Sequence, residues 1–473
     1  MFFPAGVIIT GRAGLRRVVV AVISCVLAGP ALAACSGGVS PSSSSAASPA
    51  ATLPDTFAGA QARWLIAAMT HLPIGAAEVR AHFDADFLAQ LGPAALNQML
   101  QGIGDVQLVS GDVSQASTPC LQSPAGECLA VTVSTARQGR LALELAADPS
   151  GLISGLHFGP VLPPATTWQG VDAAIRSVAP QVRLLVAEVT GGSCRPVHGI
   201  DPGTPAPLGS AFKLYVLGAL ATAIAAGKAS WTQPLTITAR LKSPGSGDLQ
   251  TEPDGTKVSV QDVAADMISH SDNTAADMLI NLVGRPAAEA TLTTAGMADP
   301  SLDQPFLTTR ELFILKADQW PVLARRYTAA SQAGRRALLA AVVDRAPLPA
   351  LTAGWTTPRD IDSVEWFASA NDICHVYASL AALARRPGLS TVAGVLEIND
   401  GGLGLDPVQW PTTWFKGGDE PGVLTLTYMA TTRTGHSYVI AVLAENPSAP
   451  IGWPAVPTLL LAIQGAFTLA AHG

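Results

Sequence analysis

The sequence predicts two folded domains: a small α+β domain, then a larger one between the α+β and α/β classes that combines an antiparallel sheet with many helices. Three observations lead to this prediction. Helical patterns are followed by alternating ones between residues 54 and 162. The segment GPVLPPATTWQG, with three prolines and two glycines, marks a boundary near 160–168. Beyond it, 168–473 begins and ends with strand patterns around a mostly helical middle.

Residues 1–34 are typical of an export leader. Three arginines precede the apolar run VVVAVISCVLAG, and small residues then lead to Cys35. This ending resembles a bacterial lipoprotein signal, in which the cysteine is lipidated and becomes the N-terminus. We therefore expect an exported protein anchored to the outer face of the cell membrane at Cys35. The alternatives are a plain signal peptide or a short transmembrane anchor, although the apolar run is shorter than the ~20 residues that a span needs. The Arg16-Arg17 pair leaves the choice between the Sec and twin-arginine routes open.

Residues 35–53 are rich in serine, alanine and proline, which is typical of a flexible tether. An exported protein can form disulfides, and four cysteines remain for them after the lipidated one. Cys120 and Cys128 bracket a turn-like segment and could close a small loop. Cys194 and Cys374 either pair or are simply buried.

The composition excludes some classes of partner. The net charge is −7, and it becomes more negative without the leader, which carries three arginines and no acid. Such a chain is not expected to bind nucleic acid. There is no C-x-x-C or H-E-x-x-H spacing, so we expect no metal and no cofactor. The sequence does not indicate an oligomeric state.

The first domain, 54–162, is expected to be helical and then to form a meandering sheet. Helical patterns cover 61–72, 76–91 and 93–103, and strand patterns cover 106–113 and 129–158. Its histidines, His71, His82 and His157, are scattered, so we expect structural roles for them and no catalytic cluster.

Along the sequence, the second domain is expected to have most of its helices between an early strand and three closing strands. The predicted elements are a helix at 171–180, a strand at 182–190 and closing strands at 412–418, 423–432 and 437–445. The apolar tail at 457–473 is short for a membrane span, so we expect it to pack against the closing sheet.

The segment PLGSAFKLYVLGAL, 207–220, places a serine and a lysine three residues apart at the start of an apolar helix. On a helix this spacing brings both side chains to one face, where Lys213 can take the proton of Ser210. The helix N-terminus also favours a developing negative charge. Alone, the pair is equally consistent with a surface lysine whose stem covers apolar residues.

Two further polar segments follow. Ser271-Asp272-Asn273 lies between two amphipathic helices. We expect Ser259 to cap the first helix and the second helix to begin at Thr274. This leaves Ser271 and Asn273 free to point into a cleft. Lys416-Gly417-Gly418 lies on a strand, where two glycines allow a ligand to approach the backbone closely. Alone, they could be a helix connector and a strand end.

In this order, S-x-x-K, S-D-N and K-x-G resemble the signature of serine β-lactamases and penicillin-binding proteins. The resemblance covers about 170–470, and 246–279 is especially similar to the class A β-lactamases. It implies a class A-like domain with an antiparallel sheet flanked by helices and an all-helical lobe. No metal takes part in this chemistry.

The resemblance also implies roles for the residues. Ser210 would be the acylated nucleophile and Lys213 its base, Ser271 would pass a proton to the leaving group, and Asn273 would orient the substrate. Lys416 would bind a substrate carboxylate and tune Lys213, beside Gly417 and Gly418. The backbone N–H groups of Ser210 and Asp419 would form the oxyanion hole.

Two departures from the family pattern concern substrate and turnover. Gly417 stands where the family has a hydroxyl residue, so one hydrogen bond to a substrate carboxylate is missing. The Glu-x-x-Leu-Asn segment that activates the deacylating water is also missing. Glu311, three residues after Thr308, fits a helix cap better than a base, and Glu365 is a second candidate. Deacylation would then be slow, or would use Lys213.

The two-domain layout resembles actinobacterial lipoproteins of the Lpq type and the β-lactamase-like protein of clavulanic-acid gene clusters. That resemblance implies a cystatin-like or steroid-isomerase-like first domain and a second domain that acts as a serine hydrolase or esterase. We therefore expect an acyl-enzyme at Ser210 formed from a β-lactam, ester or peptide-like substrate. The alternative is a non-catalytic or weakly catalytic penicillin-binding lipoprotein of the cell envelope.

Overall fold

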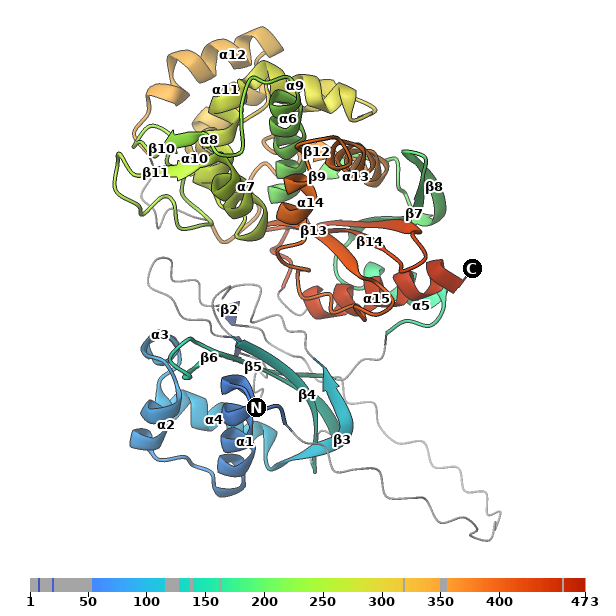
Figure 1. Cartoon of the computed structure of the whole chain (residues 1–473). Coiled ribbons are helices and arrows are strands. Elements are labelled where there is room, and N and C mark those ends of the chain that lie inside the picture. Colours follow the sequence, from blue (N-terminus) through green and yellow to red (C-terminus); the bar gives the residue numbers. More distant parts are fainter. Residues whose placement is uncertain are drawn as a thin grey trace. The chain divides into compact units, whose positions relative to one another are not determined.

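The computed structural model describes residues 7–8, 19–20, 53–114, 127–136, 139–160, 164–317, 320–348, 355–452 and 455–472. The chain divides into two compact units, Met1–Leu162 and Pro163–Gly473 (Figure 1). Within the expected leader, β1 (Val7–Ile8) pairs with β2 (Val19–Val20). Cys35 and the tether up to residue 52 lie outside the described residues, and so does Cys120.

The first unit has four α-helices and a four-stranded antiparallel meander among its described residues. The helices are α1 (Phe57–Ala68), α2 (Ala76–His82), α3 (Ala85–Gln90) and α4 (Pro93–Ile103), with a 3₁₀ turn at Met69–His71. The strands are β3 (Val106–Ser114), β4 (Glu127–Thr135), β5 (Gly139–Ala147) and β6 (Ile153–Pro160), paired in that order. Leu65 and Leu100 of the helices share one buried core with Leu143 and Leu145 of the sheet. The predicted order of helices and then strands is therefore confirmed.

Two histidines of the first unit have structural partners. The His82 ring stacks on Trp64 at 3.7 Å and its Nδ1 lies 2.8 Å from Gln61 Oε1. His71 Nδ1 lies 2.6 Å from Thr70 Oγ1. These contacts agree with the structural roles predicted for both. The side chains of His157 and Cys128 lie outside the described part of the chain.

The second unit is built on a five-stranded antiparallel sheet in the order β13-β14-β15-β7-β8. Its strands are β7 (Gln181–Thr190), β8 (Ser193–Ile200), β13 (Thr412–Glu420), β14 (Val423–Thr431) and β15 (Ser437–Glu445). The predicted strands correspond to β7, β13, β14 and β15, whereas β8 was not predicted. β8 is a mostly exposed edge strand with Cys, Pro and His among its eight residues, so it lacks the apolar alternation that marks a half-buried strand.

Helices cover the sheet on both faces and form a separate lobe (Figure 1). The helices α5 (Trp168–Arg176) and α15 (Ala455–His472) pack on one face, and α13 (Ala370–Ala384) packs on the other. The lobe and its neighbours comprise α6 (Lys213–Ala225), α7 (Val260–Ser269), α8 (Asn273–Val283), α9 (Arg285–Thr294), α10 (Thr309–Lys316), α11 (Val322–Thr328), α12 (Gln332–Ala341) and α14 (Thr391–Leu396). Short strands pair as β9 (Ala206–Pro207) with β12 (Phe367–Ala368), and β10 (Pro234–Thr236) with β11 (Lys257–Ser259).

The helix α15 packs against the sheet, as predicted for the apolar tail. By length and hydropathy it is the one helix of the described residues that could span a membrane, but 56% of it is buried inside the protein. Its Leu459, Ile463 and Phe467 side chains are fully buried, and the Trp410 ring meets Phe467 at 5.1 Å. A Cβ at Gly465 would lie 2.2 Å from the Ala165 carbonyl oxygen, so only glycine permits this approach. The burial explains its apolar character without a membrane.

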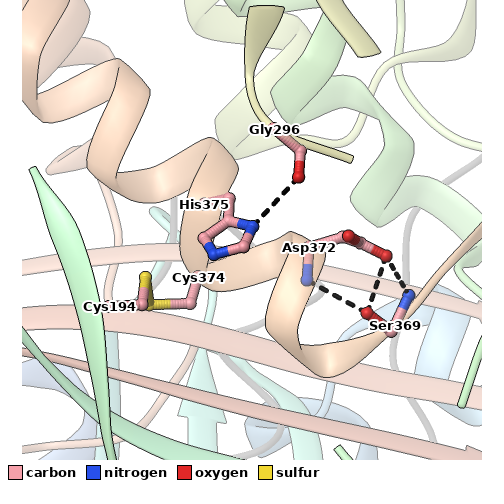
Figure 2. Close-up of a disulfide and its surroundings, with 6 residues drawn as sticks. All are labelled: Cys194, Gly296, Ser369, Asp372, Cys374 and His375. Atoms are coloured by element: carbon pink, nitrogen blue, oxygen red, sulfur yellow. Dashed lines mark hydrogen bonds between the residues drawn. A yellow bond between two sulfur atoms is a disulfide. The ribbon is translucent and has the colours of Figure 1, made fainter. Parts of the chain in front are cut away.

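A disulfide joins Cys194 of β8 to Cys374 of α13 across 180 residues (Figure 2). Ser369 caps α13, accepting a hydrogen bond from Asp372 N, and His375 Nδ1 lies 3.0 Å from the Gly296 carbonyl oxygen (Figure 2). Of the two possibilities for these cysteines, pairing is the one observed. The bond ties the edge strand to a helix on the face opposite α15.

Replacing both cysteines, as Cys194→Ser/Cys374→Ser, should lower the free energy of unfolding by about 2–5 kcal/mol, because the long closed loop no longer restricts the unfolded chain. Thermal unfolding followed by circular dichroism measures this. Wild-type protein reduced with dithiothreitol should approach the stability that the variant shows in the absence of dithiothreitol. A variant as stable as untreated wild type would contradict the structural role of this bond.

Candidate active site

Ser210 lies in a 3₁₀ turn, Gly209–Phe212, that runs directly into α6. Gly209 has φ of 50°, in the left-handed region that suits glycine. Just before it, Leu208 N donates a 2.8 Å hydrogen bond to the Trp366 carbonyl oxygen, which continues the β9–β12 pairing. The turn is thus fixed on one side by β12 and on the other by a buried helix.

Lys213 is fully buried and surrounded by oxygen atoms. Its Nζ lies 3.0 Å from Ser210 Oγ, 2.6 Å from Ser271 O, 3.1 Å from Ser271 Oγ and 2.7 Å from Asn273 Oδ1. Burial, and then the charge of Lys416, hold the pKa of Lys213 well below its usual value. A neutral amine at this position can accept the hydroxyl proton of Ser210.

Ser271 and Asn273 come from the connection between α7 and α8. Ser271 has φ of 55°, which a non-glycine residue seldom adopts and which is found at functional sites. Asp272 caps α8, whereas a helix that began at Thr274 would be capped by Asn273. The Asp272 carboxylate accepts hydrogen bonds from Ala275 N at 2.7 Å and Leu249 N at 2.9 Å. The predicted start of α8 was therefore one residue late.

Both polar atoms of the Asn273 side chain have partners, so the side chain is not free, and its direction toward a cleft stays a prediction. Its side chain is buried, its Oδ1 accepts from Lys213, and its Nδ2 donates to the Pro244 carbonyl oxygen at 2.8 Å. In this arrangement Asn273 positions the lysine, and its contact with substrate stays a prediction. The loop whose Pro244 carbonyl oxygen binds the Asn273 amide was not predicted from the sequence, although its Ser243-Pro244-Gly245 pattern is typical of a turn.

Lys416 completes a continuous polar chain with Ser271 in the middle. Its Nζ donates to Ser271 Oγ at 3.0 Å and to the Gly417 carbonyl oxygen at 2.7 Å. Burial lowers the pKa of Lys416 to about 7. Because the Ser271 hydroxyl contacts both lysines, it can pass a proton between Lys213 and a group bound beside it.

The strand β13 approaches the Ser210 turn so closely that only glycine fits. A Cβ at Gly418 would lie 2.2 Å from Leu208 O and 2.4 Å from Ser210 N, and one at Gly209 would lie 2.8 Å from Asp419 N. The backbone amides of Ser210 and Asp419 therefore belong to two segments in contact. This is the pair that the family resemblance expects to form the oxyanion hole.

Neither acidic candidate for deacylation contacts Ser210. The predicted capping role of Glu311 is confirmed, since it closes a capping box with Thr308, and its Oε1 also accepts from Arg285 at 2.6 Å. Glu365 is buried with Lys316 and Glu420, and burial followed by the nearby Glu420 raises the pKa of Glu365 well above its usual value. Among the described residues, Lys213 is the side chain hydrogen-bonded to Ser210 Oγ.

The Lys316–Glu420 pair was missed at the sequence level. Lys316 Nζ lies 2.6 Å from Glu420 Oε1 and 3.9 Å from Glu365 Oε1, and all three side chains are buried. Glu420 directly follows Asp419 on β13, so this cluster supports the end of the strand that faces Ser210. Only the rarity of lysine in the sequence could have drawn attention to it.

Two protein families match parts of the chain. The Beta-lactamase enzyme family matches residues 168–348, and the family described as ORF 12 gene product N-terminal matches residues 53–153. No curated protein matches the chain significantly. The fold class is thereby confirmed: an N-terminal α+β domain is followed by a β-lactamase-like domain with an antiparallel sheet and helices.

Solved structures with a similar fold include two bacterial β-lactamases and a penicillin-binding protein. A β-lactamase from Sphaerobacter thermophilus is 22% identical, covering 64% of this chain and 98% of its own, with a TM-score of 0.46. One from Chitinophaga pinensis is 16% identical, covering 64% and 98%, with a TM-score of 0.44. The protein PBP-A is 18% identical, covering 66% and 100%, with a TM-score of 0.42, and a variant of it is described as an acyl-enzyme complex with penicillin G.

Proposed function

We propose that the second domain is a serine hydrolase that forms an acyl-enzyme at Ser210 from an ester or amide carbonyl. The observation that carries this proposal is the 3.0 Å contact between Ser210 Oγ and the buried Nζ of Lys213. Among the described residues no carboxylate forms an ion pair with that Nζ, and burial outweighs the more distant acids, so the pKa of Lys213 is held well below its usual value. A pure binding site would not need a nucleophile paired with a base.

Acylation follows from this geometry. The Ser210 proton passes to Lys213 while Oγ attacks the carbonyl carbon, and the carbonyl oxygen takes the electron pair beside the amides of Ser210 and Asp419. When the tetrahedral intermediate collapses, its bond to the leaving group breaks. The proton held by Lys213 then reaches the leaving alcohol or amine through the Ser271 hydroxyl, 3.1 Å away. Lys213 is neutral again at the end of the step.

Deacylation is the slow step in this proposal. Glu311 is held by Arg285 and by its capping box, and Glu365 is held beside Lys316 and Glu420. Neither of these two acids is thus placed to activate water against the acylated Ser210, and we assign this role to Lys213. A long-lived acyl-enzyme is also what a penicillin-binding lipoprotein would form, so this second function differs from the first in turnover alone.

We also propose that the protein is exported and anchored at Cys35, and that it belongs with the Lpq-type and clavulanic-cluster proteins. The leader pattern and the two-domain layout support these proposals. Retention of wild type in the membrane fraction of the native host, with release of a Cys35→Ser variant, would support the anchor. Equal fractionation of the two proteins would refute it.

Stopped-flow measurement with p-nitrophenyl acetate tests the enzymatic proposal. A burst of about one equivalent of p-nitrophenolate should precede a much slower steady state, because acylation is faster than deacylation. The matched Ser210→Ala variant should give no burst. A wild-type burst that persists in Ser210→Ala, or the absence of any burst and turnover in wild type, would refute the proposal.

A further inference from the structure

We propose that Glu365 and Glu420 share one proton and act as positioning residues for the oxyanion hole. Together they hold the end of β13, which carries the Asp419 amide, against the Ser210 turn. The inference rests on the proposed function, because it concerns how that reaction stabilises its oxyanion. It comes from a buried cluster of Lys316 with the two glutamates, which lies among the segments that meet at this turn.

Glu420 lies on the face of β13 that meets the Ser210 turn. Side chains two residues apart on a strand share a face, so Glu420 follows Lys416 and Gly418. On that face, a Cβ at Gly418 would lie 2.4 Å from Ser210 N. β13 is the end strand of its sheet, and among the described strands it pairs with β14 alone. Side-chain contacts such as that of Glu420 therefore hold its last residues against the turn.

Glu365 reaches the same turn from the residues just before β12. Its Oε2 accepts a hydrogen bond from Trp366 N at 2.9 Å. The Trp366 carbonyl oxygen in turn accepts from Leu208 N, at the start of the turn, at 2.8 Å. Lys316 of α10 joins the two carboxyl groups, since its Nζ lies 2.6 Å from Glu420 Oε1 and 3.9 Å from Glu365 Oε1. The cluster thus links β13 to the segment that pairs with the residues before the nucleophile.

The cluster holds two carboxyl groups for one ammonium. The side chains of Lys316, Glu365 and Glu420 are 0%, 2% and 8% exposed, so water cannot offset a second negative charge. Burial, and then the charge of the nearby Glu420, raise the pKa of Glu365 well above its usual value. The two carboxyl groups are hydrogen-bonded to each other, and Glu420 Oε2 is buried with no hydrogen bond from another described donor. Glu365 therefore keeps its proton at neutral pH and donates it to Glu420, which stays ionised beside Lys316.

Loss of this proton would place two carboxylates beside one ammonium. Two other charged groups lie nearby. Arg359 Nη1 donates to the Lys316 carbonyl oxygen at 2.6 Å, and Asp303 Oδ1 accepts from Phe367 N at 2.8 Å. Among the described residues neither group forms an ion pair with the two glutamates, so the second negative charge stays without a counter-ion. Like charges repel, so Glu420 and the end of β13 would move away from the turn.

The burst rate with p-nitrophenyl acetate, measured from neutral pH to about pH 10, tests the inference on the full chain. In Glu365→Gln an amide replaces the protonated acid and donates to Glu420 at every pH. This variant should acylate within about threefold of wild type at neutral pH. On the alkaline side wild type should become at least about tenfold slower than Glu365→Gln, because only wild type loses the shared proton. Lys213 and Lys416 titrate in both proteins, so the difference between the two profiles reports on Glu365.

Glu420→Gln and a control variant complete the test. Glu420→Gln should acylate at least about tenfold more slowly than wild type at neutral pH, because Lys316 loses its closest counter-ion. The control Glu289→Gln removes the carboxylate of a comparable ion pair, which joins Glu289 to Arg336 at 2.8 Å in the helical lobe. It should keep the wild-type rate and pH profile even though it lowers the melting temperature. Circular dichroism verifies the fold of each variant.

The outcomes separate this inference from the proposed function. If wild type gives no Ser210-dependent burst at any pH, the proposed function fails and takes the inference with it. If wild type gives the burst but Glu365→Gln is as slow as Glu420→Gln at neutral pH, the inference alone is overturned, since Glu365 would act as an anion. Coinciding pH profiles of wild type and Glu365→Gln also overturn it. Should Glu420→Gln not fold, these two profiles decide alone.

Discussion

Lys213→Met should acylate Ser210 about 10³-fold more slowly than wild type. A positioned general base contributes 10²–10⁴-fold, and Lys213 is the side chain of the described residues that reaches Ser210 Oγ. Methionine has nearly the length of lysine and no charge, so it fits the fully buried position without a cavity. The burst rate with p-nitrophenyl acetate measures the loss, and circular dichroism verifies the fold.

The control for this variant is Lys228→Met. Lys228 is exposed in the turn after α6, so removing its charge should leave the burst rate within about twofold. A Lys213→Met protein that is folded and acylates within tenfold of wild type would contradict the assignment of Lys213 as the base. The proton of Ser210 would then have to leave by another route.

Gly418→Ala should have the second largest effect, a loss of about 10²–10³-fold in acylation. The added Cβ would come within 2.4 Å of Ser210 N and 2.2 Å of Leu208 O, so β13 and the Ser210 turn must separate. The two amides expected to bind the oxyanion belong to these segments, and their alignment cannot survive a shift of this size. Lys213 and Ser271 are not altered by the substitution, so the loss would report on the close approach itself.

The matched control is Gly394→Ala in α14, where an added Cβ meets no atom within 4 Å. It should acylate at the wild-type rate and be slightly more stable, because alanine is the better helix former. Burst rates and melting curves of both variants make the comparison. A Gly418→Ala protein with wild-type acylation would show that the oxyanion is bound elsewhere.

Spacing along the chain made much of the site predictable. Residues three apart at the start of a helix must share a face, so the contact between Ser210 and Lys213 follows from local geometry. The two more distant segments could be predicted only by family resemblance, because no local rule brings Lys416 to Ser271. The structure does bring them to 3.0 Å.

Other features depend on packing between distant segments and were not predictable. Asn273 is turned toward Lys213 because a separate loop places the Pro244 carbonyl oxygen beside its amide. Phe415 covers Gly417 because Gly401, from another loop, leaves room for the ring. β8 forms at a sheet edge despite its polar sequence, where its backbone pairs with β7 and its Cys194 bonds to α13. Each is a tertiary contact that sequence periodicity does not encode.

Turnover is where the site departs most from the family expectation. The resemblance calls for a glutamate beside the acyl group, whereas Glu311 and Glu365 are both buried beside basic side chains elsewhere. Buried pairs of this kind are costly to break, because one partner would be left charged without a counter-ion. A site equipped for attack and poorly equipped for release would accumulate its acyl-enzyme.

Mass spectrometry of the acylated protein tests the central claim most directly. The protein is incubated with p-nitrophenyl acetate and with a penicillin, then its intact mass is measured and its peptides are mapped. We predict one added acyl group on the peptide that contains Ser210, formed with at least the ester and absent from Ser210→Ala. No adduct with any compound, or an adduct that remains in Ser210→Ala, would contradict the account.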